Sequence, residues 1–177
     1  MSVSLAPTAP PDPHPDGHHP DLRSAFRRSA ASTWVVTGAA SPERAPVGFT
    51  AVSVVSVSLD PPLVSFNIAR ASSSLATLGR SRRAALHLLG GDQTHLAARF
   101  AGDRGRRFDD DGTWGWADGL PAVHGTTLRL VTDLVDLVDA GDSLLALARV
   151  RRAVPGPGAA PLVHHSGRFV ALSPIGA

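Results

Sequence analysis

The stretch Gly48–Leu63 reads GFTAVSVVSVSLDPPL and decides the fold class of this 177-residue chain. Within it, β-branched residues alternate with hydroxyl side chains, a pattern typical of a strand that buries one face. Asp60–Pro62 ends the run, since proline has no N–H to give to a sheet ladder. We therefore predict one long strand over Val47–Leu59.

Similar short runs surround this stretch on both sides. Strands are predicted over Thr33–Gly38, Leu63–Ala69, Ala84–Leu89, His124–Asp139, Ser143–Ala153 and Leu162–Leu172, the last closing the sheet. Short helices are predicted over Asp21–Ser32, with Asp21 as its cap, and over Ser74–Gly79 and Gln93–Phe100. A change of apolar phase near Leu134 and Val135 predicts a β-bulge, and residues 101–122 read as a long functional loop.

The number and spacing of these elements predict a mainly β fold. Seven or eight strands with a few short helices are typical of a small antiparallel β-barrel with Greek-key character, and not of a βαβ series. Residues 1–20 are rich in proline, aspartate and histidine and predict a disordered tail, so the folded domain is expected at 21–177. The tail histidines have no fixed geometry, and no metal site is predicted.

Composition excludes several kinds of chemistry. The chain has no cysteine, so disulfides, thiolate metal sites and a cysteine nucleophile are ruled out. All 17 basic residues are arginines, which excludes a Schiff-base or P-loop lysine. The net charge is only +2 with no long basic run, so no nucleic-acid partner is expected. No apolar run approaches the ~20 residues of a membrane span and no signal peptide is recognised, so we expect a cytoplasmic protein away from the membrane.

Several motifs resemble one known family. Gly48–Leu63 is similar to G-[FM]-T-A-x-S-x-x-S-x-S-x-[DE]-P-P-L, and NIARASSS, LAARFAG, AGDS and PLVHHSGRF follow in the order expected for that family. In these motifs the chain resembles the flavin-reductase-like, FMN-binding split-barrel proteins, the reductase components of two-component flavin monooxygenases. The resemblance implies a homodimer that holds FMN or FAD in a cleft between subunits and uses NADH or NADPH as the reductant.

The first motif supplies the expected slot for the flavin ring. Small side chains let a flat ring approach a strand edge, and backbone groups match its polar rim. The cofactor-binding residues implied here are Thr50, Ala51, Val52, Ser53, Ser56, Val57 and Ser58. Val52 stands where the family usually has asparagine, which removes one polar contact. An ordinary strand with a polar outer face is the alternative reading.

The flavin phosphate is expected after the next strand. Arg70, Ser72, Ser73 and Ser74 lie between a strand and a predicted helix start, where a guanidinium, hydroxyls and free N–H groups favour an anion. Simple N-capping by Ser73 or Ser74 is the alternative. The resemblance adds Arg107, in a place where the family often has a basic residue.

The nicotinamide site is implied by the C-terminal motifs. Arg168 is expected to hold its phosphates, and His165 to orient the nicotinamide as a catalytic residue. The second catalytic position is Ser143, which replaces the family's histidine in the motif G-D-H and cannot carry its positive charge. A strand-end histidine and a surface arginine are the alternative readings.

Hydride transfer from NAD(P)H to the flavin is the favoured reaction. In such chemistry the cofactor performs the hard step while the protein aligns it and excludes water. Reduced flavin would then reach a monooxygenase partner. Two alternatives stay open: a different redox reaction on a small molecule with the flavin retained, and a non-catalytic flavin-binding or structural homologue.

Overall fold

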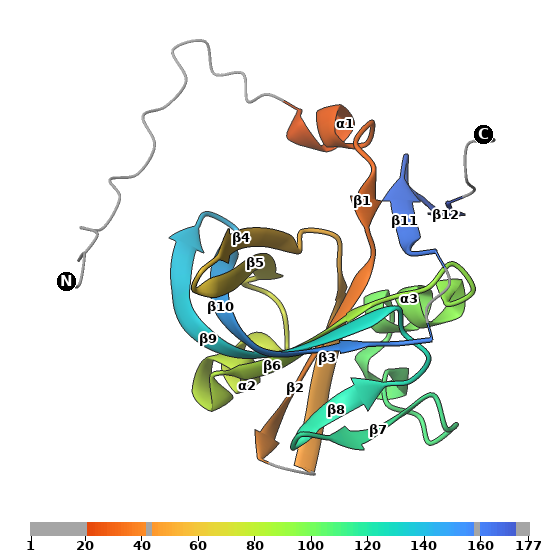
Figure 1. The fold of residues 1–177 in the computed structure, drawn as a ribbon. Coiled ribbons are helices and arrows are strands. Elements are labelled where there is room, and N and C mark those ends of the chain that lie inside the picture. Colours follow the sequence, from red (N-terminus) through yellow and green to blue (C-terminus); the bar gives the residue numbers. More distant parts are fainter. Residues whose placement is uncertain (1–20, 42–43, 158–159, 173–177) are drawn as a thin grey trace.

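The computed structural model describes residues 21–41, 44–157 and 160–172, and the predicted tail lies outside these ranges. Most described residues belong to a seven-stranded antiparallel sheet in the order β3-β2-β6-β9-β10-β5-β4, which curls around a core (Figure 1). Its strands are β2 (Trp34–Ser41), β3 (Arg44–Ala51), β4 (Val55–Leu59), β5 (Pro62–Ala69), β6 (Arg83–Leu88), β9 (Leu128–Ala140) and β10 (Ser143–Pro155). The mainly β, split-barrel prediction is thus confirmed.

The fold-deciding stretch forms two strands, so the prediction of a single strand over Val47–Leu59 was wrong. β3 and β4 lie at opposite edges of the sheet, and residues 52–54 carry the chain from one edge to the other. The Ser53 hydroxyl holds this crossing by accepting a hydrogen bond from the Asn67 N–H at 2.9 Å. Within the described residues β3 and β4 do not pair, and the barrel remains open at this seam.

The described residues include three α-helices, two of which pack on the sheet. The Asp21 carboxylate caps α1 (Leu22–Phe26) by accepting from the Ser24 N–H at 3.0 Å, although the helix ends earlier than predicted. It is shorter because the chain after it extends into β1 (Ala31–Ser32). α2 (Leu75–Ser81) packs on β2, and α3 (Thr94–Ala101) packs on β2 and β3.

The predicted long loop 101–122 contains regular structure that sequence reasoning missed. It holds the 3₁₀ turn η1 (Arg104–Arg106) and the hairpin β7 (Trp114–Ala117) with β8 (Leu120–Val123). Asp118 and Gly119 join the two strands with φ of +57° and +70°, the signature of a type I′ turn. The Asp118 carboxylate then pairs with Arg129 at 2.8 Å and fastens the hairpin to the main sheet.

The C-terminal run does not close the main sheet, which corrects the prediction for Leu162–Leu172. It forms β11 (Leu162–His165) and β12 (Arg168–Ala171), which join β1 in a separate three-stranded sheet. The reason is the two-residue turn at Ser166 and Gly167, both at positive φ, which folds the run back on itself.

The predicted bulge in the long hairpin is confirmed. Leu147 of β10 faces Asp136, whereas Ala148 faces Leu134, so Val135 is the extra residue. The Arg82 side chain supports the bulge by donating to the Leu134 carbonyl at 3.1 Å and to the Val135 carbonyl at 2.5 Å.

Two packed regions hold these layers together. The first fills the barrel and includes the fully buried Phe66, Ile68, Leu78 and Leu86. The second joins the outer side of β2 to α3 through Val35, Leu89, Leu96 and Phe100. This second packed region lies under α3 and holds the helix at the edge of the barrel where the candidate site lies. Among the described helices, none has both the length and the apolar character needed to cross a bilayer.

His87 is a fully buried core residue, and it makes stability depend on pH. Burial lowers the pKa of His87 to about 4, from the ordinary imidazole value of about 6.5, while a contact of Nδ1 with the Val35 carbonyl at 3.1 Å partly opposes this. Between these values the unfolded chain binds a proton that the folded chain excludes. The stabilising contribution of the neutral, buried His87 to the free energy of unfolding is therefore fully present above pH 6.5, and it is lost as the pH decreases toward 4.

We expect the free energy of unfolding to drop by about 2 kcal/mol between pH 6.5 and pH 5 through this histidine alone. His87→Gln keeps a donor for the Val35 carbonyl but cannot titrate, so it should flatten that part of the profile. Urea unfolding of both proteins at pH 5 and 7 measures the difference. His165→Gln, an exposed control, should keep the wild-type slope; equal slopes for His87→Gln and wild type would contradict the account.

Candidate active site

A cavity of 500 Å³ opens at the edge of the barrel where β3 ends and β10 begins. β5 and β10 supply one wall, with Asn67, Ala69 and Ser143, while α3 supplies Phe100 and Ala101. The remaining lining residues are Phe49, Thr50, Ala51, Val52, Ser53, Ser72 and Arg107. The structure therefore brings Thr50–Ser53, Ser72, Arg107 and Ser143 together around one cavity.

A smaller cavity of 210 Å³ adjoins the first at Arg107. Its walls come from the start of β3, the turn before α2 and the loop after α3. They include Pro46, Val47, Gly48, Ser73, Ser74, Arg104 and Phe108, in addition to Arg107. Ser73 and Ser74 thus line the second cavity while Ser72 lines the first, so this serine run touches both.

Arg107 stands between the two cavities with part of its guanidinium unused. It donates to the Gly48 carbonyl at 2.7 Å and to the Gly102 carbonyl at 2.9 Å. Its Nε is buried and has no hydrogen-bond partner among the described residues. Burial lowers the pKa of Arg107, with Asp103 opposing the shift, yet a guanidinium stays charged at neutral pH. A buried cationic donor without a partner favours an anionic ligand at this point.

Gly48 shapes the same corner because the site has no room for a side chain there. A Cβ on Gly48 would lie 2.9 Å from the Val36 carbonyl oxygen and 3.0 Å from the Phe100 ring. The Gly48 carbonyl also accepts from the Ser74 hydroxyl at 3.5 Å. Ser74 occupies the N-cap position of α2 but makes no side-chain cap bond, so capping does not use its hydroxyl.

The slot residues use some of their polar groups within the fold. Thr50 donates its hydroxyl to the Ala97 carbonyl of α3 at 2.7 Å, and Ser53 accepts from Asn67 across the seam. What they present to the cavity is mainly small and apolar, together with the half-exposed Val52. Such a surface suits a flat aromatic ring.

Arg70 is committed elsewhere, which corrects its expected place beside the serines. Its guanidinium pairs with Asp139 and donates from Nε to the Gly141 carbonyl at 2.7 Å. Asp139 lies near the end of β9, and Gly141 lies in the turn between β9 and β10. Arg70 therefore ties β5 to that turn and does not line either cavity.

Ser56 and Ser58 also lie apart from the cleft. They line a different, largely apolar cavity of 310 Å³ inside the open seam of the barrel, beside Trp34 and Val64. Val57 is exposed on edge strand β4. The reason is the break at residues 52–54, which separates the two halves of the motif that was expected to be one strand.

The two catalytic positions expected from the motifs are separated as well. Ser143 lines the main cavity, and its hydroxyl donates to the Asp142 carboxylate at 2.9 Å. His165 and Arg168 face each other across the β11–β12 turn, where both are exposed. Neither lines the described walls of the two cavities.

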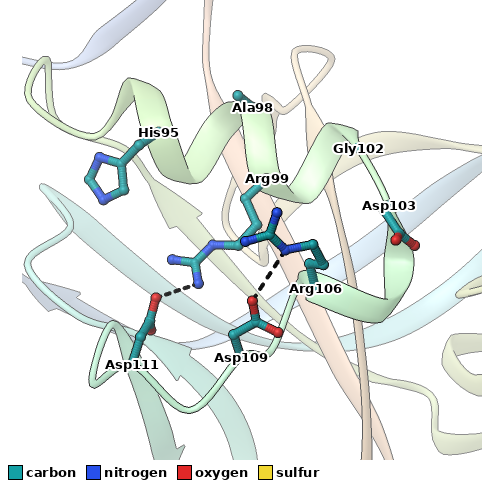
Figure 2. A pocket seen from close by; sticks show the side chains of 8 residues that line it. All are labelled: His95, Ala98, Arg99, Gly102, Asp103, Arg106, Asp109 and Asp111. Atoms are coloured by element: carbon teal, nitrogen blue, oxygen red, sulfur yellow. Dashed lines mark hydrogen bonds and ion pairs between the residues drawn. The ribbon is translucent and has the colours of Figure 1, made fainter.

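A third cavity of 430 Å³ lies on the other side of the loop that carries Arg107. Figure 2 shows Arg99 and His95 of α3 projecting toward it, with Asp111 facing Arg99 and Asp109 facing Arg106. The pairs Arg99–Asp111 and Arg106–Asp109 measure 2.7 and 3.5 Å. Two of the three carboxylates in the run Asp109–Asp111 are therefore paired with arginines. In the described part of the chain, no histidine and carboxylate group is arranged to hold a metal ion.

Sequence reasoning missed Phe49, Asn67, Ala69 and Phe100 as cavity walls. Asn67 carried a usable signal, because it is the one amide in the apolar run LVSFNIA. Phe100 carried none, since an apolar helix residue predicts only burial.

The residues present fit a flavin nucleotide. The larger cavity offers a slot of small side chains, and the smaller one offers Arg107, Ser73 and Ser74 for a phosphate. The buried Nε of Arg107 supports this fit, because it has no hydrogen-bond partner in the part of the chain that the structure describes. Both cavity volumes together lie within the range of about 300–1,000 Å³ found for small-molecule sites.

Comparisons with known proteins agree with this fit. Residues 26–173 match the flavin reductase like domain family. The chain is 42% identical over 161 residues to an NADH:FMN oxidoreductase from Rhodococcus qingshengii, covering 88% of this chain and 83% of that protein.

Two solved structures share the fold. One is the Streptomyces globisporus NADH:FAD oxidoreductase SgcE6 in complex with NAD and FAD fragments, with a TM-score of 0.81, 28% identity and coverage of 88% and 93% of the two chains. The other is the styrene monooxygenase flavin reductase of Pseudomonas putida S12, with a TM-score of 0.75, 26% identity and coverage of 88% and 100%. The chain belongs to the flavin reductase like domain family.

Proposed function

We propose that this protein is an NAD(P)H-dependent flavin reductase that binds FMN or FAD in the cleft and supplies reduced flavin to a partner monooxygenase. The observation that carries the proposal is the unpartnered, buried Nε of Arg107 between a ring-sized slot and a serine-lined cavity. The names of the relatives favour NADH over NADPH, and one of them acts in a monooxygenase system.

Bound flavin would supply the ring that accepts a hydride from the nicotinamide. The protein's own part is positioning: Ala51 and Ala69 leave space for a flat ring, and Phe49 and Phe100 shield it from water. Arg107 and Ser73 hold the phosphate. Ser143 would lie beside the ring as a neutral hydroxyl, and the exposed His165 and Arg168 would contact the nicotinamide cofactor. A cytoplasmic location, where nicotinamide cofactors are produced, belongs to the same proposal.

We also propose that the protein is a homodimer. Apolar side chains are exposed on neighbouring strands of one sheet face, with Val138 of β9 directly opposite Leu145 of β10 and Val55 on edge strand β4. The main cavity opens on the same face, through Asn67 and Ala69. A second subunit placed there would cover these apolar groups and close the cleft; a monomeric mass in solution would contradict this.

Steady-state NADH consumption at varied free FMN tests the reaction. A reductase that releases its flavin should show a rate that rises with free FMN and saturates. A protein that retains its flavin and reduces another substrate should, once loaded, show a rate independent of added FMN. A rate no higher than that of NADH and FMN alone would contradict both.

A further inference from the structure

The loop that carries Arg107 is a thin wall with a cavity on each side. Arg104, Arg107 and Phe108 line the inner cavity, whereas Gly102, Asp103, Arg106 and Asp109 line the outer one. Core packing therefore cannot hold residues 102–113 along most of their length, and residues 101–106 are exposed. The position of Arg107 must depend on a few discrete attachments.

The strongest attachment is a group that we name the clasp, formed by Arg99, Asp111 and Thr113. Arg99 donates from Nη1 to the Asp111 carboxylate at 2.7 Å and from Nη2 to the Thr113 hydroxyl at 2.9 Å. The other Asp111 oxygen accepts the Thr113 hydroxyl at 2.5 Å and the Thr113 N–H at 3.1 Å. Both Asp111 oxygens, the Thr113 hydroxyl and both terminal nitrogens of Arg99 thus have partners within the clasp, and Figure 2 shows Arg99 reaching from α3 to the loop.

The Asp111 carboxylate of the clasp remains ionised at neutral pH. Hydrogen bonds from Thr113, with a further contribution from Arg99, hold the pKa of Asp111 at about 2. The Arg99 side chain is only 14% exposed, so water competes little for its end of the pair. The ion pair between Arg99 of α3 and Asp111 of the loop therefore persists at neutral pH.

An aromatic row transmits this anchoring to the cleft. Phe108, the neighbour of Arg107, packs edge-to-face between Phe100 of α3 at 5.2 Å and Trp114 at 5.0 Å. The Trp114 indole N–H donates to the Asp109 carbonyl at 3.0 Å, just before the clasp. The loop is thereby held on both sides of Arg107, by Phe108 and Trp114 after it and by the Gly102 carbonyl before it.

We propose that the clasp is the positioning element for Arg107, so that Arg99, Asp111 and Thr113 set the affinity for the flavin phosphate without touching the flavin. The inference rests on the proposed function, since it assumes that Arg107 binds that phosphate. It predicts an effect on the phosphate and not on the ring. FMN and riboflavin, which differ only in the phosphate, are the appropriate pair of probes.

Asp111→Ala is the test variant, and its exposed neighbour supplies the matched control, Asp110→Ala. We expect Asp111→Ala to raise the Kd for FMN about tenfold and to leave the Kd for riboflavin unchanged. Asp110 has no hydrogen bond or ion pair among the described residues, so its replacement should change neither value. Thr113→Val removes the hydroxyl that links the other two groups and should show the same selectivity if Asp111→Ala folds poorly.

A double-mutant cycle separates positioning from a general loss of structure. In an Arg107→Met background, Asp111→Ala should cause no further loss of FMN affinity, because its effect acts through Arg107. Equal weakening of FMN and riboflavin, or a full additional loss in that background, would overturn the inference while leaving the proposed function intact. If Arg107→Met itself fails to distinguish the two flavins, the phosphate site fails and the clasp inference with it.

Discussion

Replacing Arg107 by methionine is expected to raise the Kd for FMN by about 100-fold, which corresponds to the loss of a charged hydrogen bond and its buried charge. The physical reason is the guanidinium charge of Arg107 where the two cavities meet, together with its buried Nε, which has no partner within the described residues. Methionine keeps much of the side-chain volume against Phe108 and Gly48. Fluorescence titration of the purified variant with FMN measures the change.

Two comparisons make this result specific. Riboflavin should bind Arg107→Met as it binds the wild type, because it lacks the phosphate. Arg107→Lys should fall between the two proteins, since an ammonium keeps the charge but cannot reproduce the fork that reaches Gly48 and Gly102. An unchanged FMN affinity in Arg107→Met would place the phosphate elsewhere.

Filling the larger cavity should abolish flavin binding altogether. Ala69 lies on β5, is exposed and lines the slot, so Ala69→Phe places a ring where the flavin ring is expected. Because the cavity has room in the free protein, stability should stay within about 0.5 kcal/mol of the wild type, as for other surface changes. Equilibrium dialysis with FMN and riboflavin measures binding, and both flavins should be excluded.

Ala98→Phe is the matched control for this prediction. Ala98 of α3 lines the outer cavity, so the same substitution adds a ring on the other side of the loop (Figure 2). This variant should still bind FMN. The opposite pattern, with binding lost in Ala98→Phe and kept in Ala69→Phe, would move the flavin site to the outer cavity.

The local sequence predicted the elements of this fold better than their connections. Short β-type runs identified β2, β5, β6 and β10, and the phase change identified the bulge at Val135, because both signals lie within one strand. The break at residues 52–54 carries no such signal: Val52-Ser53-Val54 continues the alternation, and only the position of the opposite sheet edge forces the chain to cross. The same tertiary constraint separated Ser56 and Ser58 from the cleft.

The β7–β8 hairpin was not predicted for a different reason. Asp118-Gly119 is a strong short-range signal for a type I′ turn, but the surrounding glycines and charges masked it. For the site, the motifs implied Thr50–Ser53, Ser72–Ser74, Arg107 and Ser143 as cofactor-binding or catalytic residues, and all of them line the two adjoining cavities. Arg70 was misplaced because its partner, Asp139 of β9, lies 69 residues away in the sequence, and no local pattern predicts such a pair.

We expect this protein to transfer a hydride from a nicotinamide to a flavin, with Ser143 in the cleft. Mixing the purified protein anaerobically with FMN and NADH, and following the absorbance of oxidised flavin, tests it most directly. We predict catalytic bleaching of that band, well above a protein-free control, with many flavins reduced per protein. Tight FMN binding without bleaching by NADH or NADPH would contradict the claim and would identify a flavoprotein with another reductant.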